Sequence, residues 1–146
     1  MMANPTRSKE EPSLLSIAYV SVADPMISEK DISRLVAQAQ RNNERAGLTG
    51  ALLFNGRNFF QILEGPEAKL EACLQIIRMD PRHSGMVEVR RRPVDRRDFA
   101  GWSMLFHHVE GEYVQDLERL AARGTLDRED ERMMTNFLAL GNRPRA

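Results

Sequence analysis

The sequence predicts an α+β fold, a ferredoxin-like two-layer sandwich in which a five-stranded mixed sheet carries two helices on one face. The prediction rests on segments of alternating apolar residues, on segments of helical period, and on the order βαββαββ in which they occur. Short connections and right-handed crossovers favour this sandwich for that order. The 146 residues suffice for one domain with its own core.

The first strand and the first helix have clear boundaries. Residues 14–21 alternate as a strand. A helix then begins at the N-cap Ser28, with Asp31 placed three residues later to complete a capping box, and it ends near Arg45, before Gly47. Its apolar stripe comprises Ile32, Leu35, Val36 and Ala39.

A hairpin and a second helix follow. Residues 49–54 and 58–64 are strands joined by the tight-turn pair Asn55-Gly56. Gly65-Pro66 opens the second helix, with proline at the tolerated first helical position, and Asp80-Pro81 ends it. The buried face of this helix is formed by Leu70, Cys73, Leu74 and Ile77.

Two further strands and two helices complete the expected order. The strands are 86–92 and 101–106, separated by a charged bend. The segments 113–122 and 127–140 have helical period and apolar faces, so we expect them to pack on the sheet face that the first two helices leave uncovered. The chain therefore divides into a domain, 14–106, and a C-terminal helical extension, 107–146.

Composition limits the classes of function. The 21 basic and 21 acidic residues cancel, which removes the positive field that non-specific nucleic-acid binding needs. The single cysteine, Cys73, cannot form an intramolecular disulfide, as is usual in a reducing cytosol. Residues 1–12 are polar, and no apolar run reaches membrane-spanning length. We expect a cytoplasmic protein that contacts neither nucleic acid nor membrane.

Five polar side chains are predicted to face the layer between helices and sheet. Tyr19 and Ser21 alternate onto the apolar face of the first strand, and Gln61 does so on the third. Asn42 and Asn43 extend the inner face of the first helix. An unpaired amide in a core costs roughly 1–3 kcal/mol, so this set indicates a pocket for a flat ligand edged with hydrogen-bond donors and acceptors.

This constellation resembles the BLUF domain, a family of blue-light sensors that use flavin. The resemblance covers about residues 14–106, roughly two-thirds of the chain. Its motifs are Tyr19-Val20-Ser21, Asn43 with Gly47-Leu48-Thr49-Gly50, Phe60-Gln61-Ile62-Leu63-Glu64-Gly65, Asp80-Pro81-Arg82-His83, and Phe99 with Trp102-Ser103-Met104. It implies the ferredoxin-like sandwich, with a fifth strand beside the first, and a non-covalent flavin, FAD or FMN, between the two helices. Of the two flavins we expect FAD, although the sequence does not distinguish them.

The resemblance also implies roles for single residues. Tyr19 matches the light-driven electron donor, and Gln61 matches the amide that links this tyrosine to the flavin and rearranges after excitation. Asn43 matches a contact to the flavin carbonyl edge, and Asn42 and Arg82 match further flavin contacts. Ser21 and Met104 complete the expected cofactor-binding set. Trp102 and Met104 match a mobile pair on the fifth strand that relays the change outward.

The sequence departs from the family pattern at two places. Ile76 stands where the second family helix often carries a basic residue, which affects one flavin or ribityl contact. Ser16 and Ile17 occupy the stretch of the first strand where the family commonly has an arginine. Neither departure involves the pair of Tyr19 and Gln61.

Other functions remain open at this stage. A flavin-free regulatory or dimerisation module could hold the same amides paired in its core. An acylphosphatase-type enzyme shares the sandwich, but it needs a phosphate-binding arginine after the first strand, and residues 22–27 contain none. The basic run 90–97 is interrupted by Asp95 and fits a solvated bend, and His107-His108 point apart on a strand, so we expect neither nucleic-acid nor metal binding.

We therefore predict a blue-light receptor without enzymatic activity of its own. In that case its signal must leave through protein contacts. We expect a homo-oligomer and a downstream signalling protein whose identity the sequence does not indicate.

Overall fold

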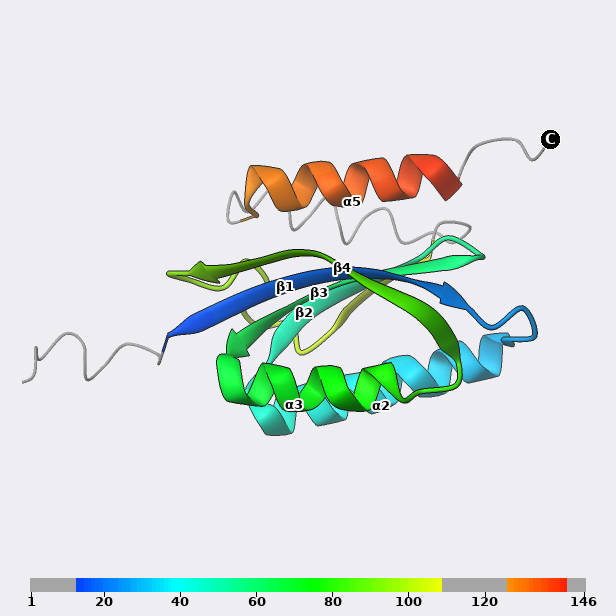
Figure 1. Ribbon diagram of the computed structural model, residues 1–146, viewed down its shortest axis with the longest axis horizontal. Helices are drawn as coiled ribbons and strands as arrows, with labels where there is room; N and C mark the ends of the chain where they lie inside the picture. The colour runs from blue at the N-terminus through cyan, green and yellow to red at the C-terminus, as the bar shows by residue number, and fades with distance from the viewer. Residues whose placement is uncertain (1–12, 109–125, 142–146) are drawn as a thin grey trace, which may run out of the picture.

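The computed structural model describes residues 13–108 and 126–141. The five strands are β1 (Leu14–Ala23), β2 (Thr49–Phe54), β3 (Asn58–Pro66), β4 (His83–Val94) and β5 (Leu105–His108). The helices are α2 (Glu29–Ala46), α3 (Glu67–Arg78) and α5 (Arg128–Gly141). Figure 1 shows α2 and α3 side by side beneath the sheet and α5 above it. The predicted α+β two-layer arrangement is thereby confirmed, with α5 as an added third layer.

The strands form one mixed sheet in the order β4-β1-β3-β2-β5. β1 is antiparallel to both β3 and β4, and β2 is antiparallel to β3, whereas β5 lies parallel to β2. The expectation that the fifth strand lies beside the first is therefore wrong. β4 pairs along the length of β1 and occupies that edge, so the open edge of β2 is left for β5.

Local signals explain most of the helix boundaries. Ser28 and Asp31 form the predicted capping box, in which each side chain accepts a hydrogen bond from the other residue's backbone N–H. Gly47 ends α2 with φ of 72°, a conformation that glycine adopts without a Cβ penalty. Pro66 differs from the prediction, because it precedes the first helical residue of α3 and still belongs to β3.

The last two strands differ from their predicted limits. β4 runs from His83 to Val94, longer than the predicted 86–92, and its pairing with β1 contains two irregularities that the period-two pattern does not reveal. β5 begins only at Leu105. Trp102 and Met104 therefore lie in the connection between β4 and β5, and not on the fifth strand as expected. The glycine of that connection, Gly101, has φ of 88°, which breaks the extended conformation before the strand begins.

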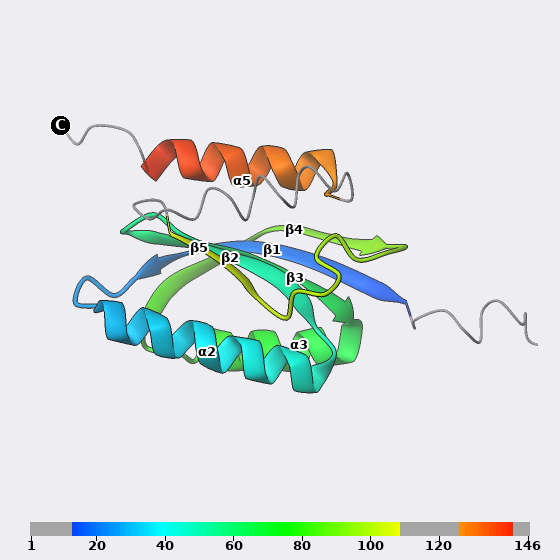
Figure 2. The same ribbon diagram turned by 180° about the vertical axis from the view of Figure 1, so that it is seen from behind.

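Two apolar cores lie on opposite faces of the sheet, and Figure 2 shows the same three layers from behind. The core under α2 and α3 contains Ile17, Leu63, Leu70 and Leu74. The core under α5 contains Ile62, Phe99, Met134 and Phe137. α5 thus covers the second sheet face, as predicted for residues 127–140, whereas the predicted helix 113–122 lies outside the described residues.

None of the helices in ranges 13–108 and 126–141 combines the length and apolar character needed to cross a membrane.

Candidate functional site

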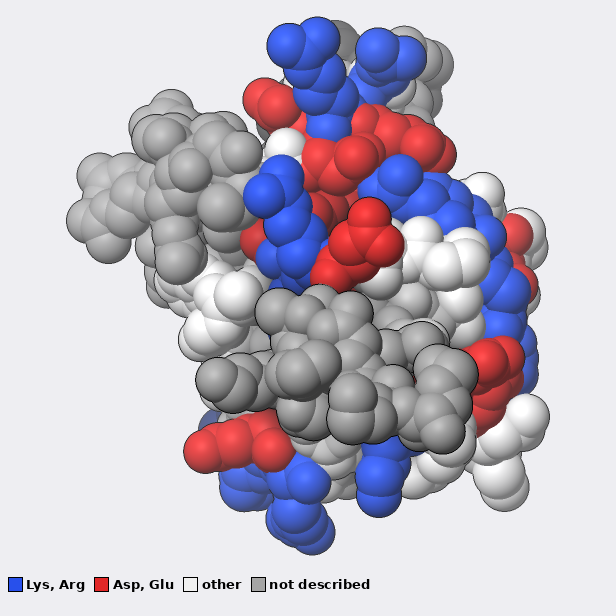
Figure 3. All heavy atoms as spheres, turned by 90° about the vertical axis from the view of Figure 1, so that its left-hand side faces the viewer, with Lys and Arg blue, Asp and Glu red and all other residues white. Residues whose placement is uncertain are grey.

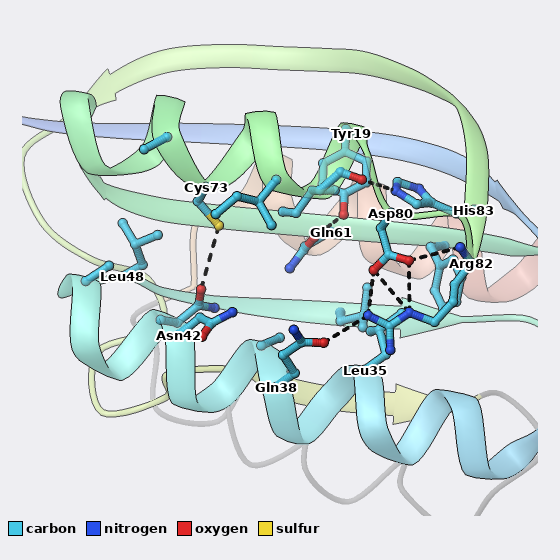
Figure 4. Close-up of a pocket in the computed structure, with 18 of the residues that line it drawn as sticks. Tyr19, Leu35, Gln38, Asn42, Leu48, Gln61, Cys73, Asp80, Arg82 and His83 are labelled. Atoms are coloured by element: carbon cyan, nitrogen blue, oxygen red, sulfur yellow. Dashed lines mark hydrogen bonds and ion pairs between the residues drawn. The ribbon is translucent and has the colours of Figure 1, made fainter.

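A pocket of about 310 Å³ lies between the sheet and the two helices α2 and α3. Its volume is at the lower end of the range for small-molecule sites, roughly 300–1,000 Å³. Figure 4 shows side chains from α2, α3, β1 and β3 converging on this space. Its apolar walls are formed by Leu35, Ala39, Ala46, Leu48, Leu52, Phe59, Ala72, Ile76 and Ile77.

Tyr19 and Gln61 lie at the sheet side of the pocket, directly opposite each other on β1 and β3. The Tyr19 hydroxyl donates a hydrogen bond to the Gln61 Oε1 atom. Both side chains are buried. Burial, followed by the nearby Cys73 and Asp80, raises the pKa of the Tyr19 phenol far above its usual value. The phenol therefore stays protonated and remains a donor to Gln61.

The other end of the Gln61 amide faces Met104. Its Nε2 atom lies 3.7 Å from the Met104 Sδ atom and donates to it. Met104 is buried on the pocket side of the sheet, while the half-buried Trp102 packs against the core under α5. The two predicted relay residues therefore lie on opposite faces, and the connection that carries them passes from one face to the other.

The C-terminal part of α2 binds this connection directly. The buried Asn43 donates from Nδ2 to the Ser103 carbonyl over 2.8 Å and accepts from the Cys73 thiol over 3.9 Å. Gln40 donates to the Met104 carbonyl over 3.2 Å. Burial raises the pKa of the Cys73 thiol, so it remains a neutral donor. Asn43 thus joins the pocket wall to the segment before β5.

Charged groups gather at the opposite end of the pocket. The Arg82 guanidinium forms an ion pair with Asp80 at 2.6 Å and donates to Gln38 Oε1 over 3.0 Å, as Figure 4 shows. The hydrogen bond from Arg82 holds the pKa of the Asp80 carboxyl below its usual value. His83 Nε2 lies 2.5 Å from the Ile77 carbonyl, so His83 supports the turn after α3.

Most of the predicted ligand-contacting residues meet in this pocket. Tyr19, Asn42, Asn43, Gln61 and Arg82 all line it. Of the others, Met104 reaches the pocket's edge only through its contact with Gln61.

Ser21 does not line the pocket. It is buried on β1, and its hydroxyl has no hydrogen-bond partner among the described residues. Alternation placed it correctly on the face of Tyr19, but two residues farther along the strand it lies past the end of the pocket.

Sequence reasoning missed four polar lining residues. Gln38, Lys69, Asp80 and His83 contribute to the pocket. Gln38 lies one helical turn before Asn42 on α2, so the period of this helix could have identified it. Lys69 lies on α3 and lines the pocket together with Ile76, the position where the family pattern often has a basic residue. Helical periodicity could not indicate that Asp80 lines the pocket, because Asp80 lies after the end of α3.

A family model described as BLUF, sensors of blue-light using FAD, matches residues 14–105. The chain belongs to the BLUF family. It is accordingly a blue-light sensor that binds a flavin, and the buried hydrogen bond from Tyr19 to Gln61 lies at the pocket that its helices and sheet enclose.

Sequence relatives include longer proteins. The chain is 47% identical over 60 residues to the blue light- and temperature-regulated antirepressor BluF of Escherichia coli, covering 41% of this chain and 15% of that protein. It is 32% identical over 139 residues to the photoactivated adenylate cyclase subunit beta of Euglena longa, covering 90% and 16%. The chain therefore spans less than a fifth of the length of these curated relatives.

Solved structures show the same fold. A structure of BlrP1 BLUF matches with a TM-score of 0.73 and 33% identity, over 91% of this chain and 95% of that one. The dark-state structure of BlrB, a BLUF protein, has a TM-score of 0.66 and 33% identity, over 74% and 83%. Klebsiella pneumoniae BlrP1 with FMN and cyclic diGMP has a TM-score of 0.74 and 35% identity, over 86% and 34%.

Proposed function

We propose that this sensor reports blue light by rearranging the hydrogen bonds of Gln61 beside a non-covalent flavin, without a lasting change in redox state. The observation that carries the proposal is the buried Gln61 amide, whose oxygen accepts from Tyr19 and whose nitrogen donates to Met104. A single side chain thus connects the pocket to the segment that leaves it.

The pocket suits a flavin by the chemistry of its lining. A flat ring system needs apolar contacts on both faces, which Leu35 and Ala39 of α2 and Ile77 of α3 provide. Its polar edge needs donors and acceptors, which the amides of Asn42, Asn43 and Gln61 provide. We assign Asn43 and Asn42 to the ring edge and Arg82 to a further contact at the charged end. Ser21 is not retained, because it lies outside the pocket lining.

When bound, the flavin supplies the absorption of blue light and accepts an electron from a nearby donor. Tyr19 is the proposed donor, since its phenol is protonated, buried and bonded to Gln61. The Gln61 amide can then exchange its donor and acceptor ends while its charge stays zero. A glutamate at this position could not, because an ionised carboxylate only accepts. Exclusion of water keeps the proton within the Tyr19 and Gln61 pair.

Met104 and Trp102 are the proposed relay. Reversal of the Gln61 amide turns its oxygen toward the Met104 sulfur, which removes a donor from that contact. Met104 would then shift, and the connection would carry the shift to Trp102 in the core under α5. The output would be a change at α5 or at an interface.

Finer points extend this proposal. We propose FAD rather than FMN, which the family description supports, although a similar structure is described with FMN; chromatography of the flavin released from purified protein distinguishes them. We further propose a flavin-binding domain at 14–106 with a helical extension at 107–146, a homo-oligomer in the cytoplasm, an unidentified protein as recipient of the signal, and no enzymatic activity or nucleic-acid binding.

One absorption spectrum tests the core of the proposal. The purified protein should show oxidised flavin, a slight red shift after blue light, and full recovery in the dark, because hydrogen bonding to the flavin strengthens while its redox state is restored. A flavin-bound protein whose spectrum does not change under blue light would contradict the proposal.

A further inference from the structure

Glu64 is a buried carboxylate on β3 that has no part in the proposed photochemistry. Its side chain is 1% exposed. Side chains alternate along a strand, so Gln61 faces the pocket whereas Glu64 faces the α5 side of the sheet. On that side its direct neighbours are Ser16 of β1 and Thr49 of β2.

Three hydrogen bonds converge on this carboxylate. The Phe99 backbone N–H and the Thr49 hydroxyl both donate to Oε1, each over 2.7 Å, and the Asp98 backbone N–H donates to Oε2 over 2.9 Å. Burial raises the pKa of Glu64, and the same three bonds oppose that rise. Two of the three donors are consecutive backbone amides of the connection between β4 and β5, so the carboxylate binds this connection at one point.

The same connection is bound again at its far end, by side chains of α2 on the other face of the sheet and by the backbone of β2. Asn43 binds the Ser103 carbonyl, Gln40 binds the Met104 carbonyl, and the Gly50 N–H donates to the Trp102 carbonyl over 3.1 Å. Between the two attachments, the Trp102 N–H donates to the Phe99 carbonyl over 2.9 Å. Both ends of the segment from Phe99 to Met104 are therefore held by hydrogen bonds to other elements.

We infer that Glu64 is a positioning residue for the photocycle. Its bonds hold the Asp98 and Phe99 backbone in place, and this fixed attachment favours the return of Met104 to its contact with Gln61 in the dark. This inference rests on the proposed function, because it assumes that Met104 moves when Gln61 rearranges. Hydrogen bonds to a charged group are stronger than those between neutral groups. The backbone amides of Asp98 and Phe99 bind Glu64 and do not contact the residues of the pocket. The attachment at Glu64 therefore survives the displacement and favours the dark position of Met104.

The variant Glu64→Gln tests the inference in the flavin-bound protein. The substitution keeps the shape and one accepting oxygen, but it sets an amide N–H₂ against the Asp98 N–H. Dark recovery should slow by about tenfold, the factor that one hydrogen bond to a charged group contributes, while flavin content and the red shift persist. Recovery at the wild-type rate, or faster, would overturn the inference.

Thr49→Val is the matched control. It keeps the side-chain volume but removes a donor to the same carboxylate and an acceptor for Arg97 of the connection. Both bonds from Glu64 to the connection stay in place, as do the bonds from Arg97 to the Glu64 and Gly47 carbonyls. Its unfolding midpoint should fall and its recovery rate should stay within about twofold of wild type. If Thr49→Val slows recovery as much as Glu64→Gln does, Glu64 acts only through general stability and the inference is wrong.

A measurement on the wild-type protein does not depend on how the variants fold. Amide hydrogen exchange under continuous blue light should leave Asp98 and Phe99 as protected as in the dark, while Trp102 and Met104 change. Equal loss of protection at all four residues would show that the attachment at Glu64 does not persist under blue light, and the inference would be wrong. A wild-type protein that binds flavin but shows no photocycle would instead contradict the proposed function. Failure of the proposed function and failure of the inference on Glu64 therefore give different results.

Discussion

The buried polar contacts on the two faces of the sheet differ in their chemistry. On the pocket face the buried contacts around Gln61 are neutral and come from Tyr19, Gln61 and Asn43, whereas the ion pairs Arg82–Asp80 and Arg91–Glu71 are partly exposed. On the other face charged and titratable groups join α5 to β4: the buried Arg90 guanidinium lies 2.5 Å from the Asp130 carboxyl group, and Arg92 lies 3.1 Å from Asp127. Figure 3 shows acidic and basic side chains side by side on one end of the molecule.

The neutral contacts suit a site whose hydrogen bonds rearrange, and the charged contacts suit a helix that stays docked. A neutral amide can reverse its hydrogen bonds without bringing a charge into the core, which suits a pocket that must change and return. A buried charged group has no such second arrangement, and removal of its partner leaves an uncompensated charge. α5 also packs by apolar contact, with Phe137 and Phe60 ring centroids 5.6 Å apart. We therefore expect α5 to stay docked on the sheet unless a neighbouring segment is displaced.

The largest expected effect is on the pocket face, from Gln61→Leu. The variant keeps much of the side-chain volume but removes the amide between Tyr19 and Met104, so it should bind flavin and lose the light-induced red shift completely. Tyr19→Phe should likewise block the normal photocycle by removing the phenolic proton. Spectra before and after blue light check both. Gln38→Leu, which removes a pocket amide bonded to Arg82 instead, should photocycle normally.

The next effect is on the α5 face, from Arg90→Met. Near pH 9 the variant should lower the free energy of unfolding by about 3 kcal/mol, because it leaves the buried Asp130 charge with only the more distant Arg92, at 3.9 Å. Urea denaturation of the flavin-bound protein measures this change. Arg91→Met is the matched control: Arg91 pairs with Glu71 and Glu88 at half-exposed positions, so its loss should cost less than about 1 kcal/mol. Equal losses would contradict the contrast between faces.

A smaller effect concerns pH. Burial and the hydrogen bond with Asp98 raise the pKa of Asp130 to about 8, although Arg90 and Arg92 oppose the rise. A carboxyl whose pKa is raised in the docked state stabilises docking fully below its ordinary pKa, and this stabilisation is lost as pH rises through the raised value. The α5 amides should therefore lose protection as pH rises through about 8.

Hydrogen exchange of α5, corrected for the intrinsic pH dependence, checks this prediction. Asp130→Asn should flatten the profile, since the amide stays neutral throughout. Glu131→Gln, a substitution at an exposed neighbour on the same helix, should keep it. A wild-type profile without a decline at high pH would show that Asp130 is ionised while α5 is docked.

The smallest expected effect links the two faces. Blue light should change hydrogen-exchange protection modestly in residues 101–106 and in α5, because Trp102 packs into the core that α5 covers. Exchange in light and dark measures both segments in one experiment. Change confined to the pocket residues, with α5 and the oligomeric state unaltered, would mean that the signal leaves by another surface.

Local patterns were sufficient for much of this molecule. Alternation on β1 and β3 predicted that Tyr19 and Gln61 share a face, and helical period brought Asn42 and Asn43 toward it; the structure places all four at one pocket. The capping box of α2 and the hairpin of β2 and β3 were also predictable, because each depends on residues close in sequence. The motif resemblance then joined the separate segments into one site.

Contacts between distant segments were not predictable in the same way. The sequence placed Trp102 and Met104 on a strand, but β5 begins after them and lies beside β2. The pairing of an edge strand depends on which edge of the sheet is left open. The alternation of residues within a strand does not indicate this. The three bonds to Glu64 and the pair of Arg90 and Asp130 were likewise missed, because a charged residue in an alternating strand does not indicate its partner.

The sequence by itself determined the elements, the inner face of each, and the placement of Tyr19 and Gln61 on one face, since these follow from periods of 2 and 3.6 residues and from short motifs. The tertiary structure alone decided that Ser21 lies outside the pocket, that Met104 faces Gln61 while Trp102 faces α5, and that Glu64 binds Phe99, 35 residues away. The physical reason is that hydrogen bonds and burial between distant segments depend on how the sheet and helices pack, which sequence spacing does not specify.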